Sequence, residues 1–271
     1  MDFYVGLLTY NNVKYTKLAI ASFRTRYPHR WVIVDNHSSD ATLDFLRDLK
    51  KDPKFTIFCN EENVGVAAGW NQIIKLVLED PESKYCLMVS NDVLFEPDTV
   101  DILMDFIKEH PEYLLVSPLD THRYEKRDSR IKENTVDFAC FLISRKCIEK
   151  VGFFDEEFKP AYYEDDDYTF RVRRSRVKFC TVAYAGIYHF GSVTLRKGSI
   201  NTKNIISISF IENREYFRRK WGFVPGPETP LWIIFAGFFW GGLLNAPIGL
   251  KQRAIKAYLN WFVASAKSKI D

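Results

Sequence analysis

The first sixty residues alternate short apolar runs with helical patterns, and this alternation restricts the fold more than any other feature. The apolar runs are Phe3 to Leu8, Trp31 to Val34 and Phe55 to Phe58. The segments between them, Thr16 to Arg26 and Thr42 to Lys50, carry apolar residues at helical spacing. Strand–helix–strand units of this length form right-handed crossovers between parallel strands. We therefore expect an α/β fold with a mixed, mostly parallel sheet flanked by helices.

A fourth apolar run, Tyr85 to Ser90, has the composition of a strand buried on both faces and stops at Asn91 and Asp92. Ligands of open parallel sheets bind at the carboxyl ends of the strands, where a carboxylate suits a divalent cation shared with a phosphate. Ser, Asn and Asp also favour turns, so a plain turn before the next helix is the alternative. The first two runs end in the same polar style, at Thr9-Tyr10-Asn11 and at Asp35-Asn36. This repetition predicts a polar pocket along one edge of the sheet.

Small residues alternate with amides from Asn60 to Gln72, before a helix that we expect from Gln72 to Glu79. Small residues such as Gly65 and Gly69 let the backbone approach a ligand, and a helix N-terminus favours an anion. The segment is therefore a candidate phosphate site. The alternative is tight helix packing through small residues.

Four adjacent carboxylates, Glu164 to Asp167, form a second candidate centre. Such a run is usually a solvated surface, but this one is framed by Tyr162, Tyr163 and Tyr168. Burial and mutual repulsion would raise the pKa of a carboxylate there, which suits a base at neutral pH. We expect the following helix to run from Tyr168 to Arg176.

A lone histidine, His189, lies in the segment Gly186 to Ser192. A lone histidine is more often a core or surface residue than a ligand. Imidazole is nevertheless a sensible ligand for a Mn²⁺-like ion, so both interpretations stay open.

Charge and cysteine content exclude some classes of protein. The net charge of +3 is too small to indicate a nucleic-acid-binding protein. The five cysteines are scattered without a C-x-x-C pair, which favours a reducing compartment and argues against a thiolate zinc site. The N-terminus shows no basic region followed by an apolar core, so we expect a cytoplasmic protein without a secretory signal.

The order and spacing of these motifs resemble family 2 glycosyltransferases of the GT-A fold, in the rhamnosyltransferase-like subgroup. The resemblance implies that the motifs after the first strands hold a nucleoside, that Asn63 to Asn71 lies beside the diphosphate and donor sugar, and that Asp92 binds a metal with help from His189. Ser90 stands where the first acid of a D-x-D motif would be. The residues implied in binding the nucleotide-sugar are Thr9, Tyr10, Asn11, Asp35, Asn36, Asn63, Gly65, Asn71, Ser90 and Asn91.

The same resemblance implies an inverting transfer from a nucleotide-diphospho-sugar to a hydroxyl of a glycan or lipid-linked acceptor, assisted by Mn²⁺ or Mg²⁺. It makes Asp165 the catalytic base and Glu164 an orienting residue, with Asp167 bonded to backbone or to an arginine. Two alternatives remain open. One is a sugar nucleotidyltransferase, and the other is a non-catalytic, membrane-associated sugar-binding protein, which Ser90 alone suggests.

The C-terminal part differs in composition from the rest. We expect a GT-A catalytic domain over residues 1–222 and a helical appendage over 223–271. Leu231 to Leu250 carries no charge over nearly the length that spans a bilayer, and Lys251 to Lys269 is basic. These helices either pack on the catalytic domain or in a homodimer, or contact a membrane surface, which would make the protein peripheral at the inner face of a membrane.

Overall fold

The structure is a computed structural model that describes residues 3–124, 127–191 and 200–225. Contacts divide the chain into two units, Met1–Tyr216 and Phe217–Asp271. The predicted appendage, including the uncharged stretch 231–250, lies almost wholly outside the described residues, so its boundary and role stay predictions. Within the described ranges, no helix combines the length and the apolar character needed to cross a membrane.

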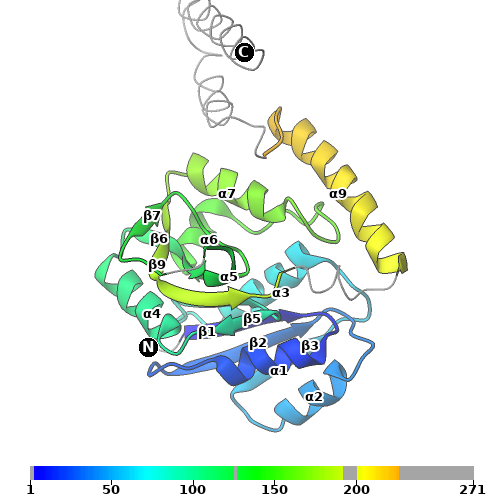
Figure 1. Cartoon of the computed structure of the whole chain (residues 1–271), viewed down its shortest axis with the longest axis horizontal. Helices are drawn as coiled ribbons and strands as arrows, with labels where there is room; N and C mark the ends of the chain where they lie inside the picture. Colours follow the sequence, from blue (N-terminus) through cyan, green and yellow to red (C-terminus); the bar gives the residue numbers. More distant parts are fainter. Residues whose placement is uncertain (1–2, 125–126, 192–199, 226–271) are drawn as a thin grey trace, which may run out of the picture. The chain divides into compact units, whose positions relative to one another are not determined.

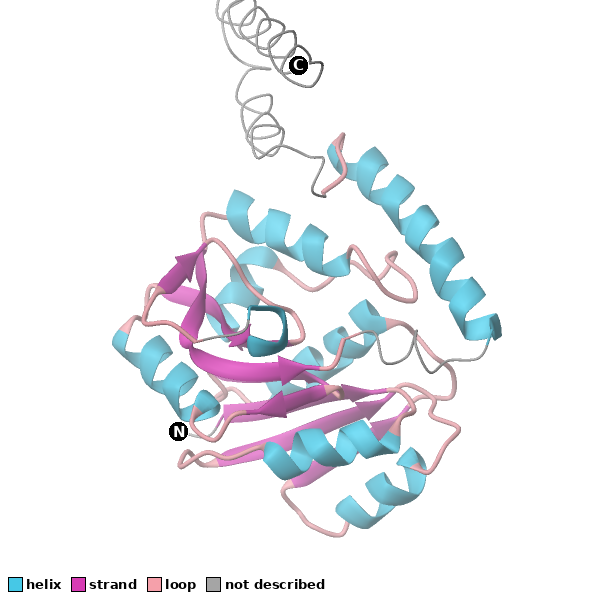
Figure 2. Cartoon of the chain, in the orientation of Figure 1, coloured by secondary structure: helices cyan, strands magenta, loops and turns pink. Residues whose placement is uncertain are grey.

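Nine strands of the described residues form one mixed sheet, shown in Figures 1 and 2. They are β1 (Phe3–Thr9), β2 (His29–Asp35), β3 (Phe55–Cys59), β4 (Tyr85–Ser90), β5 (Val93–Phe95), β6 (Tyr113–Asp120), β7 (Ile131–Glu133), β8 (Cys140–Ser144) and β9 (Lys178–His189). The order is β3-β2-β1-β4-β8-β6-β9-β5, and β7 pairs with β9. Strands β3, β2, β1 and β4 are parallel, whereas β8 runs antiparallel between β4 and β6. The predicted α/β class with a mixed sheet is confirmed.

Eight helices of the described residues connect these strands. They are α1 (Val13–Ser22), α2 (Thr42–Leu49), α3 (Val66–Glu79), α4 (Thr99–Glu109), α5 (Thr121–Tyr124), α6 (Arg145–Val151), α7 (Glu164–Arg174) and α9 (Ile200–Trp221). Helix α3 begins six residues before the predicted start, and α7 begins four residues before it. In both cases the first turns of the helix have the composition of a loop, and both turns lie at the candidate site.

The sheet separates two apolar cores. On one face Val5, Leu7 and Ile33 pack with residues of α2 and α4. On the other face Val34 packs with the apolar side of α3, with α6 and with α7. Figure 1 shows α1 and α2 on one side of the parallel strands and α3 on the other. Burial on both faces explains why β1, β2 and β4 are continuous apolar runs in the sequence.

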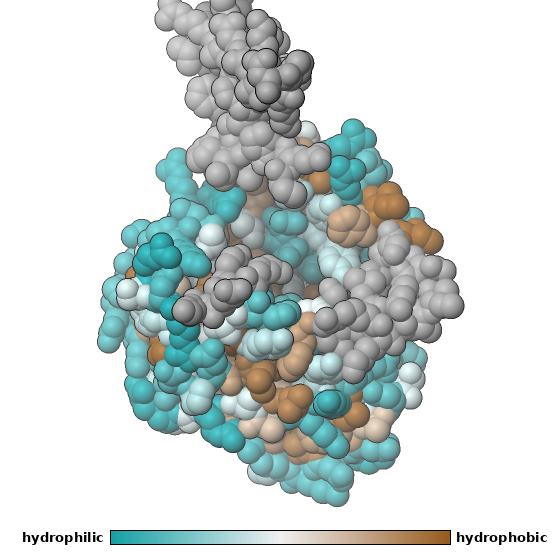
Figure 3. All heavy atoms as spheres, in the orientation of Figure 1, coloured by the Kyte–Doolittle hydropathy of each residue, from teal (hydrophilic) through white to brown (hydrophobic). Residues whose placement is uncertain are grey.

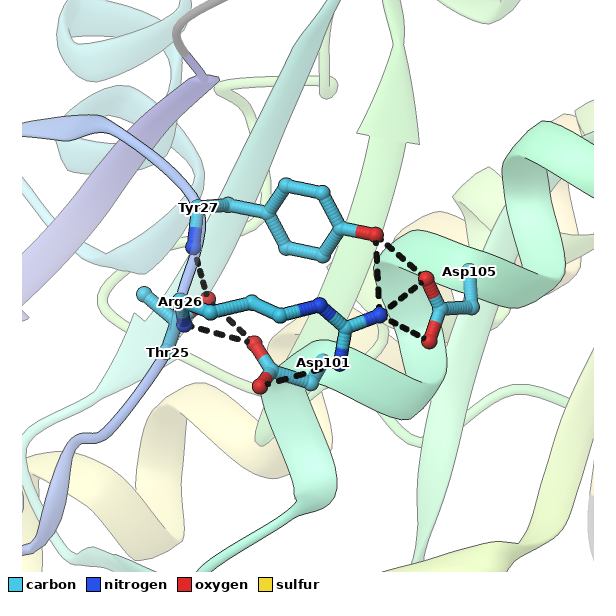
Figure 4. Close-up of polar contacts among 5 residues, drawn as sticks. All are labelled: Thr25, Arg26, Tyr27, Asp101 and Asp105. Carbon is cyan, nitrogen blue, oxygen red and sulfur yellow. Dashed lines mark hydrogen bonds and ion pairs between the residues drawn. The ribbon is translucent and has the colours of Figure 1, made fainter.

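The segment that follows α1 is fastened to α4 by a polar cluster, shown in Figure 4. One guanidinium nitrogen of Arg26 lies 2.6 Å from both carboxylate oxygens of Asp105, and another lies 3.3 Å from Asp101. Thr25 donates a hydrogen bond to Asp101, and Tyr27 donates one to Asp105. The Arg26 side chain is 58% exposed, so these ion pairs orient the connection to β2 and contribute little stability.

The face of the molecule drawn in Figure 3 is mostly hydrophilic, with a hydrophobic group over α9. From residue 208 to the end of that helix, the exposed large apolar residues are Ile208, Phe210 and Ile211. Phe210 is 43% exposed, although its ring also contacts Tyr162 and Tyr163.

Candidate functional site

Three neighbouring strands place polar residues side by side at one edge of the sheet. Thr9 of β1 pairs with Asp35 of β2, and Leu8 pairs with Ser90 of β4. Because the strands are parallel, their carboxyl ends meet, as the strand endings predicted. The loops that follow these strands therefore build the candidate site.

The loops after β1 and β2 hold each other through short polar contacts. The buried carboxylate of Asp35 accepts hydrogen bonds from the backbone N–H of Ser38 (2.8 Å) and from its hydroxyl (2.5 Å). The same hydroxyl oxygen accepts from the N–H of Asn11 at 2.7 Å, and the Asn11 side-chain oxygen accepts from the N–H of Ser39 at 2.7 Å. Asn11 and His37 have φ of 55° and 68°, in the left-handed region that asparagine tolerates best. These hydrogen bonds to Asp35 shape the loop that follows β2.

Asn36 organises the segment that precedes α3, because its amide uses all four of its bonding positions. The nitrogen donates to the side-chain oxygen of Asn63 (2.8 Å) and to the carbonyl of Gly65 (3.1 Å). The oxygen accepts from the Asn60 side chain (3.2 Å) and from the N–H of Val64 (3.0 Å). Asn36 is 3% exposed, so its side chain supports the predicted donor segment from beneath.

The two glycines of this segment are required for different structural reasons. Gly65 has a φ of 89° and ends the loop before α3, where an added Cβ would lie 3.0 Å from the Pro160 carbonyl oxygen. Gly69 lies inside α3, where an added Cβ would lie 2.5 Å from a methyl of Leu8. Gly69 therefore allows α3 to pack closely on β1. This agrees with the alternative interpretation of the segment, in which small residues serve helix packing.

Two predicted binding residues are occupied inside the protein. The amide nitrogen of Asn71, 1% exposed, donates to the Phe154 carbonyl (2.9 Å) and to Glu156 (2.8 Å), and its oxygen accepts from the Phe154 N–H (2.9 Å). The amide nitrogen of Asn91 lies 3.1–3.2 Å from the Thr9 and Thr16 hydroxyls and the Asn11 carbonyl. Both amides fix the positions of neighbouring segments. Tyr10 and Ser90 are partly exposed, and Asn63 is exposed.

Asp92 and His189 meet beyond the end of β4. The Asp92 carboxylate lies 3.3 Å from the His189 ring nitrogen Nε2, and the two side chains are 13% and 21% exposed. Their approach follows from backbone pairing, because β5 runs antiparallel to the end of β9 with Val93 opposite His189. Burial lowers the pKa of His189, but the hydrogen bond to Asp92 and the nearby carboxylates outweigh it and raise the pKa above its usual value.

A carboxylate and an imidazole that lie next to each other can both be ligands of a divalent ion, which would take its further ligands from the substrate. Across residues 3–124, 127–191 and 200–225 there is no group of three His, Cys, Asp or Glu side chains arranged to hold a metal. Asp92 and His189 can supply two ligands. Substrate phosphates and water supply the others in sites of this kind.

The four acids occupy the first turn of α7 and do not precede it. Negative charge is favourable at a helix N-terminus, which explains the early start. Glu164 is 6% exposed, and its oxygen Oε2 is buried without a hydrogen-bond partner among the described residues. Burial, followed by the charges of Asp165 and Asp166, raises the pKa of Glu164 well above the usual carboxyl range. Asp165 is partly exposed.

Asp167 has the partner that was expected for it. It is fully buried and accepts from the Arg171 guanidinium at 2.8 Å, one helical turn further on. Arg171 also donates to the Val151 carbonyl at 3.0 Å. Asp167 therefore fixes α7 against α6, and the prediction of an arginine partner is confirmed.

Backbone contacts bring the acid turn of α7 to the segment at the start of α3. The Val66 N–H donates to the Pro160 carbonyl at 2.7 Å, and Gly65 packs against the same residue. Pro160 lies four residues before Glu164, and Asn71 holds the earlier part of the same loop. The two predicted centres are thus joined through residues 154–160.

Two residues of this site were not identified from the sequence. The buried Asp120 ends β6, and its oxygen Oδ1 accepts from the backbone N–H groups of His122 (3.0 Å) and His189 (3.2 Å). The segment Tyr113 to Asp120, a mostly apolar run that ends on an acid, was the available signal for it. Asn213 of α9 lies far along the chain, and no local pattern marks it.

Comparisons with known proteins agree with this arrangement. The family described as Glycosyl transferase family 2 matches residues 4–186. The fold resembles the crystal structure of S. aureus TarS 1-349 in complex with UDP-GlcNAc, with a TM-score of 0.57, 16% identity, and coverage of 83% of this chain and 74% of that one. It also resembles the mannosyltransferase PcManGT from Pyrobaculum calidifontis in complex with GDP-Man and Mn²⁺, with a TM-score of 0.55, 16% identity, and coverage of 95% and 79%. At these identities the likeness concerns the fold, and the expected GT-A class is confirmed.

One curated relative matches over a short stretch. A galactofuranosyl glycosyltransferase of Leishmania donovani is 56% identical over 34 residues, which is 12% of this chain and 8% of that protein. The matched stretch is thus a small fraction of that relative.

Proposed function

Since this chain belongs to glycosyl transferase family 2, we propose that it is an inverting glycosyltransferase that uses a nucleotide-diphospho-sugar. One observation carries the proposal. The Asp92 carboxylate lies 3.3 Å from the His189 ring beyond the end of β4, and the Val66–Pro160 hydrogen bond ties the loop before the acid turn of α7 to the start of α3. A single displacement needs a group that neutralises the leaving diphosphate and a carboxylate that takes the acceptor proton. The Asp92–His189 pair and the acid turn of α7 are our candidates for these two roles.

We assign the donor to the edge formed by the loops after β1, β2 and β4. Tyr10, Asn11 and Ser90 are partly exposed at that edge, and Asn63, in the loop after β3, is exposed; they would contact the nucleoside, the diphosphate and the donor sugar. The buried residues Thr9, Asp35, Asn36, Gly65 and Asn71, together with the amide of the partly exposed Asn91, keep the loops in place, as their hydrogen bonds and packing indicate. In this proposal only a few side chains contact the donor directly, and the others hold the loops that carry them.

Asp92 and His189 would hold Mn²⁺ or Mg²⁺. When bound, such an ion neutralises charge that develops on the leaving diphosphate. Asp120, through the backbone of His189, keeps the imidazole next to Asp92. The Mn²⁺ in the structure of the Pyrobaculum calidifontis enzyme supports this assignment.

Asp165 is the proposed base. Its carboxylate would take the proton of the acceptor hydroxyl while that oxygen attacks the anomeric carbon, and the bond from that carbon to the diphosphate oxygen breaks on the opposite face. Glu164 is buried, and its burial raises its pKa above the usual carboxyl range, so we assign it to orienting the site.

Nucleotide sugars in the matched structures, UDP-GlcNAc and GDP-Man, support hexosyl or deoxyhexosyl transfer in general. We propose rhamnosyl-type donors and a glycan or lipid-linked acceptor, as expected in polysaccharide biosynthesis, on the motif resemblance alone. We also propose that residues 231–271 contact a membrane surface. Flotation of the full chain and of a chain ending at residue 230 with anionic vesicles tests this, and equal behaviour of the two would refute it.

Release of nucleoside diphosphate tests the main proposal. The protein is incubated with Mn²⁺ and, in turn, UDP-GlcNAc, GDP-mannose and a nucleotide-activated rhamnose, and slow hydrolysis without acceptor is measured. One donor should be hydrolysed well above the others, and EDTA should stop it. Formation of sugar nucleotide from a sugar phosphate and a nucleoside triphosphate would instead identify a nucleotidyltransferase. Binding of a sugar without any turnover would identify a non-catalytic protein.

A further inference from the structure

The turn that leads into α7 has an unusual backbone. Tyr162 and Tyr163, the residues just before Glu164, have φ of 79° and 73°. Bulky side chains keep this left-handed region only where their surroundings hold them there, and such residues gather at functional sites. Something outside the turn must therefore stabilise it.

Asn213 of α9 provides that contact. Its side-chain nitrogen donates to the carbonyl oxygens of Ala161 and Tyr162, both at 3.0 Å, so one amide holds two successive peptide groups. Asn213 is 4% exposed. Phe210, one helical turn earlier, places its ring 5.6 Å from that of Tyr162 and 5.2 Å from that of Tyr163. One face of α9 thus holds both tyrosines.

A second contact ties the same helix to the same loop. The Tyr216 hydroxyl donates to Asp155 at 2.9 Å, and its ring packs 4.9 Å from that of Phe158. The loop 155–163 is therefore held by α9 at both of its ends. This part of α9 therefore supports the acid turn.

We propose that Asn213 is a positioning residue for the acid turn, fixing the directions of Glu164 and Asp165 through the peptide groups of residues 161–163. This inference rests on the proposed function, because it gives Asn213 a role in the same transfer. The peptide planes before a helix determine where its first side chains point. A small rotation of this turn would move the Asp165 carboxylate away from the acceptor hydroxyl without disturbing the donor edge.

The test compares Asn213→Ala and Asn213→Asp with Glu212→Ala. Aspartate keeps the shape of asparagine but lacks both N–H donors, and Glu212 is an exposed neighbour on the same helix. Both Asn213 variants should lower kcat for transfer by about 10²-fold, the effect of a displacement of about 1 Å at a reacting group. Donor affinity should stay within about twofold in every variant, and Glu212→Ala should match the wild type. Backbone amides of residues 162–167 should exchange hydrogen faster in Asn213→Ala.

Three results would overturn the inference. They are unchanged kcat in folded Asn213 variants, parallel loss of donor affinity and kcat, and unchanged hydrogen exchange at residues 162–167. A variant that does not fold would give Asn213 a purely structural role, unless Asn213→Ser, which keeps one donor, folds and shows the loss of kcat. Absence of turnover in the wild type and in Glu212→Ala would refute the proposed function itself, and hydrogen exchange would still report whether Asn213 holds the turn.

Discussion

Replacement of Asn36 by aspartate should loosen the donor edge through the loss of two buried hydrogen-bond donors. The variant keeps the shape of the side chain and both acceptor contacts, to Asn60 and Val64. It loses the donors to the Asn63 side chain and to the Gly65 carbonyl, and it places a carboxylate oxygen against each. Rotation of the Asn63 amide cannot repair the first contact, because its oxygen also accepts from the N–H of Gly65 at 3.0 Å.

The magnitude follows from these contacts. A buried hydrogen bond contributes about 0.5–1.5 kcal/mol, and a buried acceptor left without a partner costs about 1–3 kcal/mol. Two lost donors should therefore lower the free energy of unfolding by about 2–4 kcal/mol, with the donor affinity falling as the segment 60–65 loses its fixed form. Asn60→Ala removes the donor to the Asn36 oxygen and the two hydrogen bonds with Gln72, but it should cost less, because Asn60 is partly exposed and water can replace it.

Urea unfolding monitored by circular dichroism measures the first effect, and calorimetric titration with the preferred nucleotide-sugar measures the second. The reasoning fails if Asn36→Asp unfolds at the wild-type urea concentration. It also fails if stability falls while donor affinity is unchanged, because the segment would then not belong to the donor edge.

Three further predictions concern the charged groups. Asp92→Ala should abolish transfer and weaken nucleotide-sugar binding in the presence of Mn²⁺, and normal turnover of the variant, or full wild-type activity in EDTA, would exclude the metal assignment. Asp165→Asn should lower the transfer rate by about 10²–10⁴-fold with donor affinity unchanged and with Glu157→Gln as the unaffected control, and loss of donor binding with preserved turnover would move Asp165 to the donor side. The folded-state pKa of Glu164 is raised, so its contribution to stability is present below the ordinary carboxyl pKa and is lost as pH rises through the folded value. Thermal unfolding should therefore show Glu164→Gln stabilising the protein more at pH 8 than at pH 4, and an equal effect at both would contradict the burial of this group.

The strands and their polar endings were predictable because burial on both faces is visible as an apolar run. The positions of Asp35 and Asp92 followed from that pattern alone. The start of α3 was not predictable, since Gly65 and Gly69 have the composition of a loop. Only the contact of Gly69 with Leu8 on another element shows that its small size serves helix packing.

A local sequence pattern also does not show which groups an amide side chain will hydrogen-bond. Asn36, Asn71 and Asn91 were all predicted to bind the donor, yet their amides are occupied by residues 24 to 85 positions away in the chain. Asp120 and Asn213 act in the same way, through backbone groups distant in sequence. Such contacts depend on the completed tertiary structure, which one sequence read in windows does not contain.

The short ribbon of β5 and β9 determines which sequence changes the metal-binding pair can accept. Asp92 directly precedes β5, and His189 ends β9 opposite Val93. Successive side chains of a strand alternate between the two faces, so one inserted or deleted residue between Ile187 and His189 would turn the imidazole to the opposite face. Point substitutions at Leu94 or Tyr188, which are only partly buried, would leave the pairing intact. Homologous chains should therefore vary at the partly buried positions of this ribbon while preserving its length, so that gap positions in their alignment would distinguish members that retain the pair from those that have lost it.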